Sequence, residues 1–215
     1  MGLINLFVSG GVVMWPLLGF SVLATTLIFE RGLFWLRLYK TQDPFIQKVL
    51  VLYAKQPQSA IDSLAKHTDF PIARIFLAAL TLEHGTPDDF RLALESAAQA
   101  EIPLLKRFNT VFDTVIGVAP LLGLLGTILG LMQSFSSLRI GDVAESSASD
   151  VTSGIGTALV STAAGLLVAI ATLLFANLFS GLYRRQRSAI EAYSGKLELL
   201  YRQYYRQYLE RQRLR

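Results

Sequence analysis

Residues 114–138 read TVIGVAPLLGLLGTILGLMQSFSSL, and this stretch decides the fold because none of its side chains is charged. About twenty consecutive apolar residues are enough for a helix to cross the roughly 30 Å hydrocarbon core of a membrane. The stretch therefore predicts a transmembrane helix. Within it, Gly123, Gly126 and Gly130 share one helix face, where small residues let a second helix approach closely. Helix packing is a sufficient explanation of these glycines.

Two further stretches have the same character. One runs from about Val8 to Phe29 and is followed by the charged Glu30. The other runs from about Val151 to Tyr183 and is followed by the charged Arg184. The whole chain is 52% hydrophobic and 17% charged, a balance unusual for a soluble domain of 215 residues. These features predict an all-α protein with three membrane spans, whose long helices extend into a helical cytoplasmic region.

The distribution of lysine and arginine predicts the orientation. Ten of them lie in residues 31–110 and nine in residues 184–215, whereas Arg139 alone lies between the second and third spans. Because lysine and arginine gather on the cytoplasmic side, both basic segments and the C-terminus are expected there, and the N-terminus outside. The predicted parts are the outside N-terminus with the first transmembrane helix (1–30), a cytoplasmic helical segment (31–110), the second transmembrane helix (111–138), an outside connector (139–150), the third transmembrane helix (151–183) and a cytoplasmic C-terminal helix (184–215).

Helix signals also occur outside the spans. Thr86 is followed by Pro87 and two aspartates, an order typical of a helix start. The apolar pattern then continues towards the second span, so one long helix is expected there. Pro103 and Pro120 fall inside it, and each removes a backbone donor, which predicts a bend at either proline.

The third span carries an unusual number of hydroxyl side chains. Thr157 and Ser161 are four residues apart and share a face, while Thr162 lies farther round the helix. Gly165 lies nearer Thr162, so one side can pack tightly while the hydroxyls line a polar cavity. Packing and a cavity role are both open for any single threonine, and the clustering favours the cavity.

Enzyme chemistry is not predicted. Ser153 and Gly154 superficially suggest an intramembrane serine protease, but His67 and His84 both fall in the cytoplasmic segment, so a serine–histidine pair at membrane depth is excluded. The glycine-rich GLLGTILG lacks the lysine of a phosphate loop. The chain has no cysteine, and no cofactor, metal or nucleic-acid partner is expected.

Three motifs resemble one family of membrane proteins. The first span has Trp15-Pro16-Leu17-Leu18 before Glu30-Arg31; the second has Ala119-Pro120-Leu121-Leu122-Gly123 followed by Leu124-Leu125-Gly126-Thr127; the third has Gly154-Ile155, Ala158-Leu159, Thr162-Ala163 and Gly165-Leu166. All three are similar to the ExbB/TolQ/MotA proton-channel family, closest to ExbB and TolQ, and they occur in the same order.

The resemblance implies that the chain is the subunit of a ring, a pentamer of identical chains, in the plasma (inner) membrane of a bacterium. Such a ring encloses an ExbD- or TolR-like single-span protein whose membrane aspartate carries protons, and it energises a TonB- or TolA-like protein. Carried over by position, Thr127 and Thr162 correspond to the family's pore-lining threonines. With Thr157 and Ser161 they form the predicted pore lining, while Gly123, Gly126, Gly130 and Gly165 are predicted to serve helix packing and Pro120 a helix bend.

One position departs from the family pattern. Where ExbB and TolQ proteins commonly have a glutamate in the third span, this chain has Thr157. The partner's aspartate then remains as the proton carrier, with the hydroxyls guiding water to it. Two alternatives stay open: a stator subunit of the MotA kind, although that family usually has four spans, and a passive membrane scaffold that holds a single-span partner.

Overall fold

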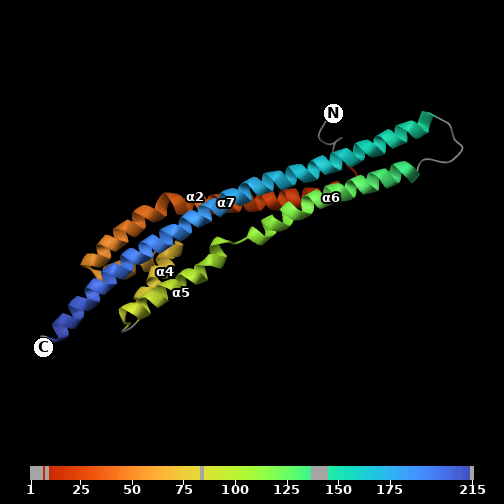
Figure 1. Ribbon diagram of the computed structural model, residues 1–215. Coiled ribbons are helices and arrows are strands. Elements are labelled where there is room, and N and C mark those ends of the chain that lie inside the picture. Colours follow the sequence, from red (N-terminus) through yellow and green to blue (C-terminus); the bar gives the residue numbers. More distant parts are fainter. Residues whose placement is uncertain (1–6, 8–9, 83–84, 137–144, 214–215) are drawn as a thin grey trace. The chain divides into compact units, whose positions relative to one another are not determined.

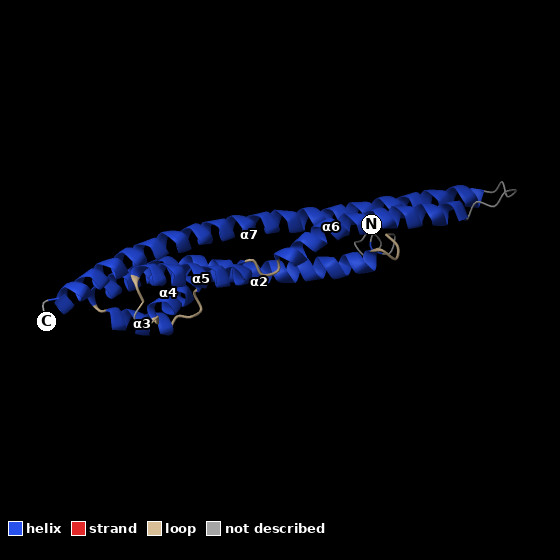
Figure 2. Ribbon diagram, turned by 60° about the horizontal axis from the view of Figure 1, so that its bottom comes forward, coloured by secondary structure: helices blue, strands red, loops and turns tan. Residues whose placement is uncertain are grey.

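The computed structural model describes residues 7, 10–82, 85–136 and 145–213, and side chains there except those of residues 145–153, 157 and 213. All regular structure in these ranges is helical (Figures 1 and 2). The helices are α2 (Met14–Lys55), α3 (Pro57–Ala65), α4 (Pro71–Leu80), α5 (Pro87–Leu105), α6 (Asn109–Ser136) and α7 (Glu145–Arg213). The all-α prediction is confirmed.

Three helical stretches in the described residues are long and apolar enough to cross a membrane: Met14–Lys55, Pro87–Ser136 and Gly154–Gln212. The three-span prediction is therefore confirmed. Each stretch is longer than a bilayer requires, since a helix rises about 1.5 Å per residue and about twenty residues suffice. The limits of the six predicted parts and their sides of the membrane stay predictions.

The chain forms two compact units. The first unit consists of residues 1–31 and 108–179, and the second of residues 32–107 and 180–215. The first unit therefore holds most of the apolar stretches, and the second holds α3, α4 and α5 with parts of α2 and α7.

The second unit has a conventional hydrophobic core. Ile72, Ile75 and Phe76 of α4 are fully buried, and so is Leu197 of α7. Because these positions recur at helical spacing, each helix buries one face and exposes the other. The helical pattern of the segment after the first span is confirmed.

The start of α5 follows its sequence signal. The Thr86 hydroxyl accepts a hydrogen bond from the backbone N–H of Asp89, and the Asp89 carboxylate accepts one from the backbone N–H of Thr86. This reciprocal capping box satisfies two backbone donors that a helix start leaves free. One turn farther along, the Phe90 ring stacks on that of Tyr201 with centroids 4.0 Å apart, and the Tyr201 hydroxyl donates to the carbonyl oxygen of Gly85 at 2.7 Å. Local capping and tertiary packing thus agree here.

The expected continuous helix from Pro87 into the second span is interrupted. Helix α5 ends at Leu105 and α6 begins at Asn109, and between them Phe108 adopts a φ of 70°. A bulky residue in this left-handed region costs free energy, so the break needs support from neighbouring groups. Pro103 lies near the end of α5, close to the break, whereas Pro120 lies within α6. The bend at Pro120 stays a prediction.

Candidate functional site

Helices α6 and α7 pack against each other through glycines in the first unit. A Cβ atom placed on Gly123 would lie 3.0 Å from the Cα of Thr162, and one placed on Gly130 would lie 2.9 Å from the carbonyl oxygen of Gly154. From the α7 side, a Cβ on Gly165 would lie 3.2 Å from the Cα of Gly123. Backbones at this distance leave no room for larger side chains. We call this contact the seam.

Two hydroxyls of α7 hydrogen-bond across the seam. Thr162 Oγ1 donates to the carbonyl oxygen of Gly123 at 3.1 Å. Ser161 Oγ lies 2.9 Å from its own helix carbonyl at Ala158 and 3.3 Å from that of Gly123. Ser161 is fully buried, and a Cβ on Gly126 would collide with its side chain. The Ser161 hydroxyl therefore lies inside the seam.

The other predicted pore-lining hydroxyls have different surroundings. Thr127 is half-buried, and its hydroxyl donates to the carbonyl of Leu124 in its own helix at 2.6 Å. Thr162 is likewise half-buried. Thr157 belongs to α7, but its side chain lies outside the described residues. The pore-lining role of all four stays a prediction.

Helical geometry places Thr127 and Thr162 on one edge of the seam. At about 100° per residue, Thr127 is rotated about 40° from Gly123, and Thr162 about 60° from Gly165, both in the same sense. Higher residue numbers in α6 contact lower residue numbers in α7, since Gly123 meets Thr162 and Gly130 meets Gly154. The two helices are therefore antiparallel (Figure 1). In an antiparallel pair, equal senses of rotation lead to the same side. We call that side the threonine edge.

Helix α2 covers the opposite edge. Leu17 of α2 and Val13, in the turn just before α2, form a buried cluster with Ala119 and Ala169, against which Leu122, Ala164 and Val168 pack. Leu122 is rotated about 100° from Gly123, and Ala164 about 100° from Gly165, in the sense opposite to the threonines. The two edges of the seam therefore differ: apolar residues beside α2 on one, and partly exposed threonines on the other.

A buried arginine marks one end of the first unit. The side chain of Arg31 is 4% exposed, and its Nε donates to Glu30 at 2.8 Å. Its guanidinium lies 5.2 Å from the centre of the Phe108 ring. This cation–π contact accompanies the strained backbone of Phe108 and gives that residue a partner within the unit.

Comparison with known proteins identifies the family. Residues 67–192, more than half of the chain, match the model of the MotA/TolQ/ExbB proton channel family. The chain belongs to this family. The predicted resemblance is confirmed.

Named relatives agree with this assignment. Biopolymer transport protein ExbB-like 3 of Synechocystis sp. is 58% identical over 199 residues, which cover 93% of this chain and 95% of that protein. ExbB-like 1 of the same organism is 42% identical over 202 residues, covering 94% and 80%. The Tol-Pal system protein TolQ of Pseudomonas aeruginosa is 27% identical over 180 residues, covering 79% and 77%. The chain is thus an ExbB/TolQ-like, multi-pass inner-membrane member of a proton channel family.

Sequence reasoning missed two features of this site. The burial of Ser161 inside the seam depends on which glycines lie opposite, and one helix pattern does not contain that information. The position of α2 on a single edge was also missed. A signal for the second was present, because small and apolar residues at 164 and 168 differ from the hydroxyl at 162.

Proposed function

We propose that this chain is the ring-forming subunit of a motor driven by the proton-motive force, which energises a TonB- or TolA-like envelope protein. Five copies surround an ExbD- or TolR-like single-span partner whose membrane aspartate carries the protons. The threonine edge carries this proposal, because it offers hydroxyls on a side of the seam that α2 does not cover. Membership of a proton channel family supports the same function.

The partner helix is proposed to lie along the threonine edge. Thr127 and Thr162 are each half-buried within one chain, so part of each side chain remains available to another helix. A threonine hydroxyl both donates and accepts a hydrogen bond, and it can therefore orient water or a neighbouring carboxyl group without titrating itself. The third span of this chain has no carboxylate, which assigns proton binding in that region to the partner.

The proposed orientation places the N-terminus outside and the C-terminus in the cytoplasm. It rests on the nineteen lysines and arginines in the two segments 31–110 and 184–215, against one in residues 139–150. Protons then move from the outside, where the connector 139–150 is expected, towards the cytoplasm.

The test begins with the partner. The full chain, tagged and purified in detergent from its native membrane, is expected to bring with it a single-span protein bearing a membrane aspartate, in a complex with five copies of this chain by native mass spectrometry. Reconstituted in liposomes that enclose a pH-sensitive dye, the complex should dissipate an imposed pH gradient, and the chain alone should not.

Each result bears on a different part of the proposal. Equal proton flux with and without the partner would place the pathway within this chain. A complex that holds a partner but conducts no protons under any gradient would favour a passive scaffold. Replacement of the partner's aspartate by asparagine is the matched control, and it should abolish the flux.

A further inference from the structure

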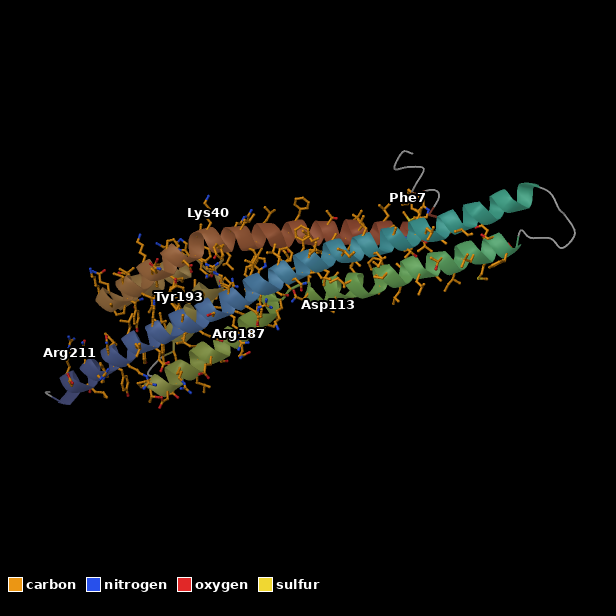
Figure 3. All side chains as sticks on the ribbon, turned by 45° about the horizontal axis from the view of Figure 1, so that its top comes forward. Phe7, Lys40, Asp113, Arg187, Tyr193 and Arg211 are labelled. Carbon is orange, nitrogen blue, oxygen red and sulfur yellow. The ribbon has the colours of Figure 1, made fainter. Side chains whose placement is uncertain are left out.

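Asp113 lies on the same face of α6 as Thr127. The two residues are fourteen positions apart, which corresponds to about 40° of rotation and about 21 Å along the helix axis. The helix surface between Asp113 and Thr127 on this face is formed by Gly117, Pro120 and Leu124. Asp113 is exposed near the beginning of α6 (Figure 3). The threonine edge therefore continues along α6 to a carboxylate.

The α7 side of the edge also ends in a polar group. Gly123 meets Thr162, and Phe112 meets Phe179 with ring centroids 5.9 Å apart, so Asp113 lies level with the part of α7 between about residues 172 and 178. Asn177 lies in this part; it is exposed and rotated about 60° from Thr162. Leu166 and Leu173 occupy the strip between Thr162 and Asn177. Polar side chains thus mark this end of the edge on both helices.

Asp113 has a distinct electrostatic setting in the first unit. Among the described residues it forms no ion pair, whereas the carboxylate of Glu30 on α2 is paired with Arg31. Arg31 in turn lies over the Phe108 ring. Neither the rest of α6 nor residues 154–179 of α7 contain a charged side chain. The remaining carboxylates of this unit are Asp142, Glu145 and Asp150, in or beside the connector. Within the part of the chain that the structure describes, Asp113 is thus a carboxylate without an ion-pair partner, at the end of the edge away from the connector.

We propose that Asp113 accepts the protons that leave the threonine edge on the cytoplasmic side. The inference rests on the proposed function and orientation, and it names a residue of this chain for a step otherwise assigned to the partner alone. A proton released from the partner's carboxyl group passes to water, and from that water to an Oδ of Asp113. The new O–H bond then breaks, the proton enters bulk water, and the carboxylate is restored. A fixed negative charge also raises the local concentration of protons at this exit.

The experiment uses the co-purified complex of full chain and single-span partner in liposomes with an enclosed pH-sensitive dye. Asp113→Asn keeps the size and polarity of the side chain but removes its ability to titrate, so proton flux should fall roughly tenfold while the complex keeps its mass. Asp113→Glu retains a carboxylate and should restore flux to within about twofold of the wild type. A purely structural role of Asp113 does not predict this difference between the two variants.

A double variant separates position from total charge. The variant that combines Asp113→Asn with Thr114→Asp has the same net charge as the wild type. Its carboxylate is rotated about 100° from the position of the Asp113 side chain, in the direction away from the threonine edge. This variant should conduct as poorly as Asp113→Asn. The inference is overturned if a conducting wild-type complex loses nothing on Asp113→Asn, or if the double variant conducts normally. A wild-type complex that conducts no protons would instead overturn the proposed function, and this inference with it.

Discussion

The hydroxyl of Thr162 donates a hydrogen bond to the carbonyl oxygen of Gly123, 3.1 Å away on the facing helix. A glycine is required for this contact, since a Cβ on residue 123 would lie 3.0 Å from both Thr162 Cα and the carbonyl oxygen of Ser161. The same pair of residues therefore fixes the spacing of α6 and α7 and holds a hydroxyl at the threonine edge. Thr162 therefore contributes both to the packing of the two helices and to the polar character of the threonine edge, two roles that the sequence alone presents as alternatives.

Thr162→Val tests the polar part of this contact. Valine has nearly the volume of threonine but no hydroxyl, so proton flux through the complex should fall while ring assembly persists. Interhelical hydrogen bonds in membranes contribute only about 0.6 kcal/mol on average, and the loss of stability should be correspondingly small. Flux in liposomes and native mass spectrometry measure the two effects separately.

Leu174→Val is the matched apolar control, since it trims an exposed leucine on the same helix that is rotated about 180° from Gly165 and so points away from the seam. It should leave flux nearly unchanged. If Thr127→Val and Thr162→Val both conduct as the wild type does, the threonines serve packing alone and the cavity role is wrong.

Gly123→Ala tests the packing part. The added methyl group has no room at the seam, and overpacking of this kind costs about 1–3 kcal/mol. Gly117→Ala is the matched control on the same helix, because a Cβ there meets nothing within 4 Å. Since alanine favours the helix by roughly 0.5–1 kcal/mol over glycine, Gly117→Ala should raise the thermal stability of the purified protein, while Gly123→Ala lowers it. Equal shifts in the two variants would contradict the close approach of α6 and α7.

Local signals in the sequence were sufficient for the helices and for one of their starts. The α5 start was predictable because Thr86 and Asp89 are three residues apart, and a capping box needs no distant partner. The three spans were predictable because lipid requires long uncharged runs, which composition alone reveals.

Tertiary contacts were not predictable in the same way. Arg31 follows the first apolar run and suggests a solvated interfacial charge, yet it is buried beside Phe108, 77 positions later in the chain. The helix break at Phe108 was missed because glycine, the usual residue at positive φ, is absent there. The burial of the Ser161 hydroxyl inside the seam likewise depends on which residues of α6 lie opposite α7. The residue pattern of one helix does not contain this information.

The amide pair Gln42 and Gln186 offers a test of the second unit. Both side chains are buried, and each donates to the amide oxygen of the other, at 3.1 and 3.0 Å. Gln42→Leu should destabilise the protein by about 1–3 kcal/mol, because it leaves the buried amide of Gln186 without its partner. The double variant with Gln186→Leu removes both amides and should cost less than the sum of the single variants. Chemical denaturation in a double-mutant cycle measures the coupling, and strict additivity would show that the two amides act independently.

The capping box predicts a dependence of stability on pH. Hydrogen bonds from the Thr86 hydroxyl and backbone N–H hold the pKa of Asp89 below its ordinary value. A carboxylate with a lowered folded-state pKa stabilises the fold above its unfolded pKa, and this contribution is lost as pH falls through the folded pKa. The stability difference between wild type and Asp89→Asn should therefore be constant above about pH 5 and shrink below about pH 4. A difference that grows on acidification would contradict the assignment.

Cysteine labelling tests the proposed orientation. A cysteine at Ser147, in the predicted outside connector, should react with an impermeant thiol reagent added to intact cells. A cysteine at Ser63 or Ser188 should react only after the membrane is opened, because both lie in segments whose lysines and arginines favour the cytoplasm. Ser188 is preferable to the nearby Ser194, whose hydroxyl is buried and would hinder the reagent on either side of the membrane. The wild-type chain has no cysteine, so every label reports the introduced position. Labelling of Ser63→Cys in intact cells would reverse the orientation and with it the direction of proton movement past Asp113.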